Sequence, residues 1–439
     1  MTVPFGTIRS LRSALANGIT TPTRLAQAAL ANANQSPGRN TYLWRDPAWT
    51  LREAERAEQM PRGDDGPFGD GRSVLWGLPV SVKDCFDLAG APTTCGTVFY
   101  RDHNGIAESD SWIVARLRSL GAVINGKTHL HPLAYGITGE NPDFGDCLQP
   151  GKEGALTGGS SSGACASVME GSAVAAIGTD TGGSVRVPAA LCGLAGYRAS
   201  IGRGNWRGGA HLAQSFDTFG WLFADLEEAP LLGSFFADSE PAYIRPYGKF
   251  AFVAEDYLRD CEPDILENYR RTIGELESLG LHASEIDVSW WSEAQDIFSP
   301  LQAWEAAGLH RGHFDRFERA IRDRLAWGAR ITLDEIAVLR QRHEAFKTRM
   351  DRLFHEHDLV MLPAAPVARL QAGADHSQTR SRLLRYTVAF SLAGVPAVTI
   401  PCTVGGMQIA AARESDTALL QLVALLGARR KAAAPALNS

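Results

Sequence analysis

Gly178-Thr179-Asp180-Thr181-Gly182-Gly183-Ser184-Val185-Arg186-Val187-Pro188 follows an apolar run and ends in a proline. Proline fits the first turn of a helix, so this stretch is predicted to join a buried strand to a helix. Gly182 and Gly183 tolerate positive φ, which lets successive backbone N–H groups point the same way and bind an anion or oxyanion. A tight strand-to-helix turn without a ligand is the alternative interpretation.

Glycine is concentrated around this stretch: 16 of the 44 glycines lie in residues 151–220, more than twice an even share. They include the run Gly158-Gly159-Ser160-Ser161-Ser162-Gly163, which leads into the small residues of 164–168. A flexible linker would not be followed by small, close-packing residues. The run is therefore predicted to shape a fixed turn that presents Ser160.

Lysine is scarce in this chain, with six lysines against 37 arginines. Lys83 ends the apolar run of 80–82, where a desolvated amine can lose its proton, whereas an arginine cannot. A surface lysine flanking a strand is the alternative. A hydroxyl nucleophile needs a general base, and no histidine lies in a sequence context that suits this role. Lys83 as the base, Ser160 as a relay and Ser184 as the nucleophile form a chemically sensible set, with the N–H groups around 181–184 as an oxyanion hole.

Three other motifs are weaker. Residues 121–128 match the Walker A pattern, but a helix precedes them and their variable positions read as a strand, which excludes a phosphate loop. Residues 159–163 match G-x-S-x-G, but a loop and not a strand precedes them. The histidine pairs His129/His131 and His355/His357 have no third ligand at a metal-like spacing, so we expect solvated or capping histidines and no metal site.

Composition argues against several classes of protein, including nucleic-acid-binding, disulfide-bonded and membrane proteins. The formal net charge is −6, from 43 basic and 49 acidic residues, which argues against nucleic-acid binding. Seven scattered cysteines without CxxC argue against disulfides and zinc. The N-terminus has no signal-peptide pattern, and the longest apolar stretch, 387–402, is broken by Gly394 and two prolines, too short to span a bilayer. We expect a cytoplasmic protein with no membrane association.

The order of apolar and polar segments predicts an α/β protein with helices on both faces of a sheet. Its core is expected at about 60–225 and 355–425, with a helical cover at about 226–350. Buried strands are predicted at 74–84, 122–125, 173–179, 359–363 and 395–401.

The motifs together resemble those of the amidase signature family. The segments that carry the resemblance are 77–84, 93–96, 158–163, 178–188, 215–220 and 392–398, with 77 residues from Lys83 to Ser160 and 24 from Ser160 to Ser184. The resemblance extends over nearly the whole chain. Residues 139–141 and 213–218 are most similar to the short plant-type indole-acetamide hydrolases.

This resemblance implies one large α/β/α domain over residues 1–439, with a twisted mixed β-sheet and no cofactor. It implies an amidase with a Ser–cis-Ser–Lys triad of Ser184, Ser160 and Lys83. Among the remaining site residues, the oxyanion hole is expected at Thr181, Gly182 and Gly183, loop bracing at Asp180 and Arg186, and substrate lining at Tyr135, Gly139 and Cys95.

We therefore expect hydrolysis of the C–N bond of a small-molecule amide, with release of ammonia. A homodimer is compatible with the sequence. Two alternatives stay open: an amidotransferase A-type subunit that generates ammonia from glutamine within a heteromer, and a non-catalytic scaffold or receptor that keeps the fold. Departures from the family pattern at 127–129, 220–221 and 405–408 concern specificity and not the triad.

Overall fold

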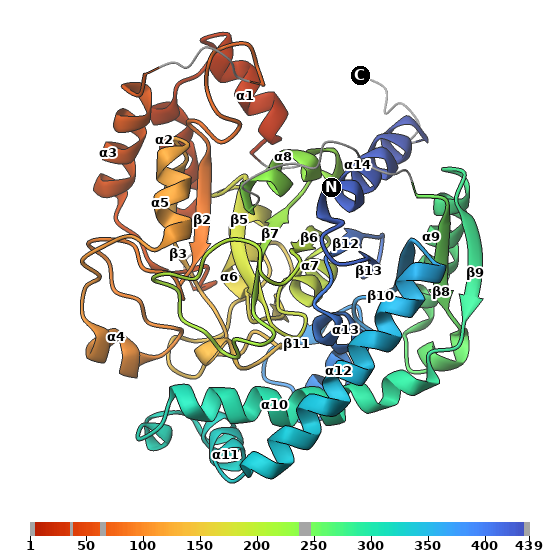
Figure 1. Cartoon of the computed structure of the whole chain (residues 1–439). Helices are drawn as coiled ribbons and strands as arrows, with labels where there is room; N and C mark the ends of the chain where they lie inside the picture. Colours follow the sequence, from red (N-terminus) through yellow and green to blue (C-terminus); the bar gives the residue numbers. More distant parts are fainter. Residues whose placement is uncertain (1–4, 36–37, 62–66, 237–246, 434–439) are drawn as a thin grey trace.

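A computed structural model describes residues 5–35, 38–61, 67–236 and 247–433. Within these residues the centre of the molecule is an eleven-stranded sheet in the order β1-β3-β2-β5-β7-β6-β12-β13-β10-β8-β9 (Figure 1). The strands are β1 Tyr42–Trp44, β2 Pro79–Lys83, β3 Val123–Thr128, β5 Ala175–Asp180, β6 Ala195–Arg198, β7 Thr218–Phe223, β8 Lys249–Val253, β9 His282–Ile286, β10 Leu359–Pro363, β12 Ala397–Pro401 and β13 Gly406–Ala411.

The sheet is mixed, as predicted. Strands β3, β2 and β5 run parallel to one another, as do β10, β8 and β9, and the remaining pairs are antiparallel. A separate two-stranded sheet pairs β4, Ala155–Leu156, with β11, Leu370–Gln371. Parallel neighbours bring the carboxyl ends of β2 and β5 to the same edge of the sheet, which places Lys83 near Asp180.

Fourteen α-helices occur in the described residues. They are α1 Ile8–Ala16, α2 Pro22–Asn34, α3 Pro47–Glu58, α4 Val98–Asn104, α5 Trp112–Ser119, α6 Ser162–Met169, α7 Arg186–Cys192, α8 Ala229–Gly233, α9 Pro263–Glu277, α10 Ala294–Leu309, α11 Arg319–Gly328, α12 Leu333–Glu356, α13 Thr379–Ala393 and α14 Asp416–Ala433. None of the helices in the described ranges combines the length and apolarity that a membrane crossing requires.

Helices cover both faces of the sheet, and strand β7 shows why. Leu222 packs in a cluster with Ala164 of α6 and Ala189 of α7. The next side chain back along the strand, Trp221, has its ring centroid 5.2 Å from that of Phe235, in the segment that follows α8. Because successive strand residues point to opposite faces, each face of β7 has its own helical layer.

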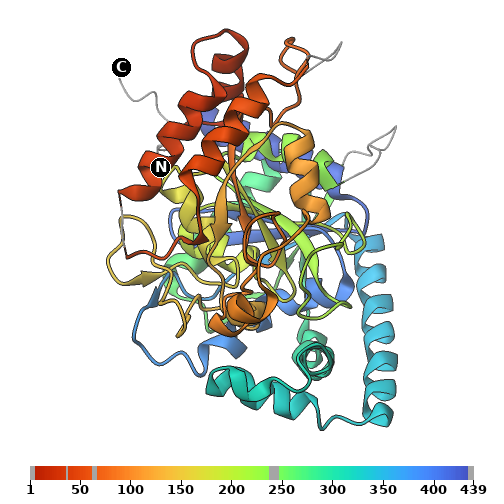
Figure 2. The ribbon, with the colours of Figure 1, turned by 90° about the vertical axis from the view of Figure 1, so that its left-hand side faces the viewer.

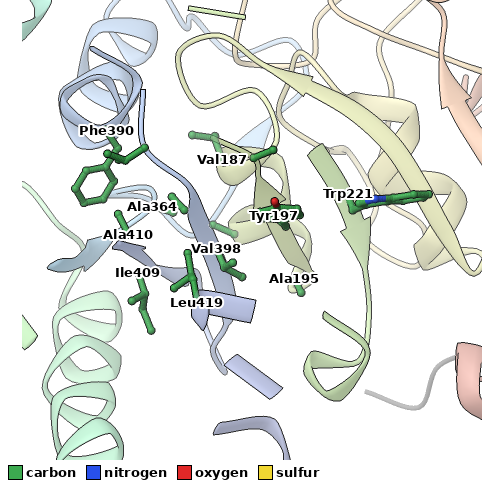
Figure 3. Packing of buried hydrophobic residues seen from close by; sticks show 14 of the residues in the cluster. Val187, Ala195, Tyr197, Trp221, Ala364, Phe390, Val398, Ile409, Ala410 and Leu419 are labelled. Atoms are coloured by element: carbon green, nitrogen blue, oxygen red, sulfur yellow. The ribbon is translucent and has the colours of Figure 1, made fainter. Parts of the chain in front are cut away.

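The core continues into the C-terminal half of the sheet. Figure 3 shows Phe390 of α13 and Leu419 of α14 packed near the strands that carry Val398, Ile409 and Ala410. All five side chains are buried, with at most 1% of their surface exposed. Helices α13 and α14 therefore share one core with the strands β12 and β13.

The segment 226–350 differs in part from the expected helical cover, because it also supplies β8 and β9 to the sheet. Helix α10 packs on both α11 and α12, and α10 and α12 also pack on α13. Figures 1 and 2 place these three helices at the lower end of the molecule, opposite α1 and α3. The predicted strand at 359–363 is found as β10, whereas the strand predicted at 74–84 is shorter, Pro79–Lys83.

Candidate active site

Lys83 is the last residue of β2 and is fully buried. Its Nζ lies 2.8 Å from Ser160 Oγ, 3.2 Å from Ser161 Oγ and 2.7 Å from Thr179 Oγ1. Three hydroxyl oxygens therefore surround the amine, and in the described chain no carboxylate lies within ion-pairing distance of it. The structure thus brings together two of the three side chains expected to share a proton.

Burial changes the acidity of this amine. Desolvation lowers the pKa of Lys83 to about 8, and the weaker charge effects of Cys85, Asp217 and Asp180 oppose this shift. A buried ammonium without a counter-ion is unfavourable, so more of Lys83 is neutral near neutral pH than of an exposed lysine. A neutral amine can accept a proton from a hydroxyl group that is hydrogen-bonded to it.

Ser160 lies in the turn between β4 and α6, and the Gly159–Ser160 peptide bond is cis. Close packing holds this turn: a Cβ atom added at Gly139 would lie 2.6 Å from the carbonyl oxygen of Gly158. Gly139 also has φ of +89°, where L side chains are strained. The next residue after Ser160, Ser161, donates its backbone N–H to the Ser184 carbonyl oxygen at 3.2 Å. Ser160 and the second loop are thereby joined through the backbone.

Asp180 braces the second loop from inside the core. Its carboxylate accepts from Gly183 N–H at 2.8 Å and Val185 N–H at 3.1 Å, and it also pairs with Arg186 Nη2 at 3.0 Å and Arg198 Nη1 at 2.9 Å. Burial would raise the pKa of Asp180, but the two guanidinium groups outweigh it and hold that pKa well below its usual range. Asp180 stays ionised, so it holds the loop at any working pH.

The backbone N–H groups of 181–184 divide into two sets. Gly183 N–H donates to Asp180, so it serves the brace and is not free for an oxyanion. The amides of Thr181, Gly182 and Ser184 have no acceptor within the described residues. Side-chain contacts hold this segment, because Thr181 Oγ1 donates to Asp217 at 2.6 Å and Thr387 Oγ1 to the Gly182 carbonyl oxygen at 2.5 Å.

Ser184 borders a small cavity of about 10 Å³, which is about the space of one water molecule. Its side chain makes no hydrogen bond to Ser160 in the part of the chain that is described. Tyr135 lies in the wall of this cavity, as expected of a lining residue. Gly139 packs against the Gly158 turn and Cys95 packs with Leu133, and neither borders the cavity.

Lys127 is a second buried lysine that the sequence analysis missed. Its Nζ lies 2.7 Å from Asp84 Oδ1, and both side chains are fully buried. It lies in β3, so the residues that match the Walker A pattern form a strand and cannot wrap a phosphate. The preference of this chain for arginine, which singled out Lys83, applies equally to Lys127. The two lysines differ in their partners: Lys127 forms an ion pair with Asp84, whereas Lys83 lies among hydroxyl groups.

Arg198 was also not identified from the sequence. A charged residue in the buried strand β6 indicates that a buried partner of opposite charge lies nearby. Thr179 could be inferred from the alternation of β5, since it precedes Asp180 and points to the other face. The expectation of solvated histidines is wrong for His129 and His131, which are 0% and 9% exposed. Burial lowers the pKa of His129 to about 4.

No group of three or more histidine, cysteine or acidic side chains placed to hold a metal ion occurs in the described ranges. All seven cysteines are free thiols. The chemistry available at the site is therefore that of an amine, hydroxyl groups and oriented backbone amides. Such a set is suited to acyl transfer from an amide nitrogen to a serine oxygen.

Comparisons with known proteins find similar sequences and structures over most of the chain. The sequence model of the Amidase family matches residues 24–420. Indoleacetamide hydrolase of Pseudomonas savastanoi is 30% identical, with 96% of each chain covered. The A-type subunit of the glutamyl-tRNA(Gln) amidotransferase of Gloeobacter violaceus is 27% identical, with 90% of this chain and 89% of the relative covered. A crystal structure of an amidase superposes with a TM-score of 0.86 and 28% identity, over 97% of this chain and 100% of that one.

Proposed function

Because the chain belongs to the Amidase family, whose members hydrolyse amide C–N bonds, we propose that it cleaves a small-molecule primary amide through a seryl acyl-enzyme and releases ammonia. The observation that carries the proposal is the buried Lys83 amine, 2.8 Å from Ser160 Oγ and without a carboxylate partner among the described residues. Such an amine is a base that can take a proton from a serine hydroxyl group.

In the first step, neutral Lys83 accepts the Ser160 hydroxyl proton while Ser160 accepts that of Ser184. Ser184 Oγ forms a bond to the amide carbonyl carbon, and the carbonyl electron pair moves onto oxygen. The free amides of Thr181, Gly182 and Ser184 stabilise that oxyanion. The Lys83 proton then returns through Ser160 to the amide nitrogen, the C–N bond breaks, and ammonia leaves. Water attacks the acyl-enzyme by the same proton path and restores Ser184.

The hydrogen bond between Ser160 and Ser184 forms in this scheme only when the substrate is bound. Hydrogen bonds of a catalytic site are often long in the absence of substrate and shorten in the reacting complex. The backbone hydrogen bond from Ser161 N–H to the Ser184 carbonyl oxygen holds the two turns together.

The test is ammonia release from primary amides by the purified protein. Ser184→Ala is expected to abolish release, and Lys83→Arg to lower it at least 100-fold, because arginine keeps the charge but cannot act as the base. Lys249→Arg, at an exposed position of β8, is the matched control and should leave the rate unchanged. An active Ser184→Ala protein, or Lys83→Arg at near-normal rate, overturns the mechanism.

The similarity to a component of an amidotransferase supports one alternative, ammonia production from glutamine within a heteromer. That function predicts glutaminase activity that depends on a partner chain, whereas a free amidase acts alone. Lys83, Ser160 and Ser184 are all present, which counts against a non-catalytic scaffold. Seven free thiols support a cytoplasmic location, since oxidising compartments favour disulfides.

A further inference from the structure

Two arginines meet at Tyr135 without a carboxylate partner in the described chain. Arg324 of α11 has its Cζ 4.4 Å from the centroid of the Tyr135 ring, and Arg380 of α13 has its Cζ 5.9 Å from it. Arg324 Nη1 donates to the Tyr135 carbonyl oxygen at 2.5 Å, and Arg380 Nη2 donates to Gln302 Oε1 at 3.1 Å. Each guanidinium group has five N–H donors, so several remain for a ligand.

These arginines lie at the entrance to the cavity at Ser184. An outer cavity of about 790 Å³ is lined by both arginines and by His131. It shares Gly136, Ile137 and Arg380 with the inner cavity that Ser184 borders. Arg380 is the one charged residue that borders both cavities, so it stands where a small amide would pass or bind.

Acidic residues are present in the outer cavity but are engaged elsewhere. Glu318 accepts from Ala320 N–H at 2.7 Å and Ile321 N–H at 3.0 Å, at the start of α11. Glu140, Asp146 and Asp375 each accept from a neighbouring hydroxyl or backbone N–H group: Thr138 Oγ1, Asn141 N–H and Ser377 N–H. None of these four forms an ion pair within 4.0 Å of either arginine; Glu318 acts on Arg324 only at longer range, where its charge favours the protonated guanidinium group.

Placing two cations close together in a partly buried site is unfavourable without an anion. Burial and the charge of Arg324 lower the pKa of Arg380 to about 10, so the group remains protonated at neutral pH. His131 adds an uncharged wall: burial, followed by the charges of Arg324 and others, holds its pKa well below the usual value. Its Nδ1 is buried and has no hydrogen-bond partner in the described structure.

We propose that Arg324 and Arg380 bind a carboxylate of the substrate, so that the amide this enzyme hydrolyses carries a negative charge at the end away from its C–N bond. The guanidinium fork matches a carboxylate in a bidentate manner, and stacking on Tyr135 fixes its plane. This inference rests on the proposed amidase function and specifies its substrate class. It distinguishes this chain from an enzyme that accepts only neutral amides.

The test compares amides that differ only in this charge. The probes are succinamate and glutaramate, paired with 4-oxopentanamide and 5-oxohexanamide, in which a methyl ketone replaces the carboxylate. Wild-type kcat/KM is expected to be at least tenfold higher for the carboxylate of each pair. Arg380→Gln and Arg324→Gln are each expected to lower kcat/KM for the carboxylates about 10- to 100-fold more than for the ketones.

Arg322→Gln, at an exposed position on α11, is the matched control and should change kcat/KM for neither the carboxylates nor the ketones. Arg380→Lys should recover part of the carboxylate preference, and this separates a charge effect from misfolding. Equal rates for both members of each pair, or equal losses for both in the arginine variants, overturn the carboxylate site while the amidase function stands.

Binding to the Ser184→Ala protein, measured by calorimetric titration of the same four probes, separates this inference from the reaction itself. Tighter binding of the carboxylates to Ser184→Ala, without turnover by the wild type, supports the carboxylate site and overturns the amidase mechanism. Failure of both carboxylates to bind more tightly than their ketone partners overturns the carboxylate site.

Discussion

Lys83 Nζ and Ser160 Oγ lie 2.8 Å apart, although 77 residues separate them in the chain. Strand β2 delivers the amine and the turn before α6 delivers the hydroxyl group. A second buried lysine, Lys127, lies 2.7 Å from Asp84. The two lysines thus occupy opposite electrostatic settings, one among hydroxyl groups and one against a carboxylate. That difference allows Lys83, and not Lys127, to act as a neutral base.

The rate should follow the protonation of Lys83. Burial lowers its pKa to about 8, and the neutral amine is the active form. We expect kcat/KM to fall about tenfold for each pH unit below about 8 and to level off above it. Initial rates of ammonia release between pH 6 and 9.5, at constant ionic strength and with an uncharged amide, provide the measurement. A limb centred near pH 6, or a flat profile, would argue for a different base.

Stability should separate the two lysines. The pKa of Lys83 is lower in the folded protein, about 8, than its unfolded value of about 10.4, so burial of this amine destabilises the fold below pH 8. Lys83→Met is expected to leave the free energy of unfolding at pH 7 unchanged or raised. Lys127→Met leaves the Asp84 carboxylate buried without its cation and is expected to cost about 3–5 kcal/mol.

Urea unfolding of the two variants measures this contrast. Any advantage of Lys83→Met over the wild type should shrink as the pH rises from about 8, because folding then releases the Lys83 proton at a cost that falls with rising pH and vanishes above about 10.4, where both states are neutral. A loss of stability in Lys83→Met as large as that in Lys127→Met would contradict the assignment.

Asp180 should contribute strongly to stability, because it is the shared counter-ion of Arg186 and Arg198, and all three side chains are fully buried. Asp180→Asn leaves both guanidinium groups without a charge partner and is expected to cost about 3–5 kcal/mol in the free energy of unfolding. The exposed pair of Arg101 and Asp102 offers the control, since Asp102→Asn should cause no measurable change. Equal effects of the two substitutions would show that Asp180 is not the brace.

Gly139 should position Ser160 through the Gly158 turn. Gly139→Ala would place a methyl group 2.6 Å from the Gly158 carbonyl oxygen, so the turn must shift. We expect at least a tenfold loss of kcat from this displacement. Gly280 has the same φ of +89° and no atom within 4 Å of an added Cβ, so Gly280→Ala carries only the backbone strain. Similar kcat values for the two variants would refute a positioning role of Gly139.

Much of the site was predictable because its signals are local. The glycine and serine runs mark two tight turns, and small residues beside them mark close packing. Lys83 stood out because the chain otherwise favours arginine. The alternation of apolar segments likewise predicted a sheet with helices on both faces and five of its strands. Strands β1, β6, β7 and β13 were not predicted, and β8 and β9 were missed within a segment rich in helical patterns.

Local signals specify where a turn forms and which side chains it presents. This is because the backbone angle φ, the reversal of the chain and the room for close packing are set by residues next to one another in the sequence. They could not specify ionisation or charge partners, because those depend on which distant elements pack together. Lys127 meets Asp84 across adjacent strands, and Arg324 and Arg380 reach Tyr135 from two separate helices. Desolvation and Coulomb energies act on these side chains only once the core has formed. They decide whether a lysine is a base or part of an ion pair, and whether an arginine binds an anion or is only a surface charge.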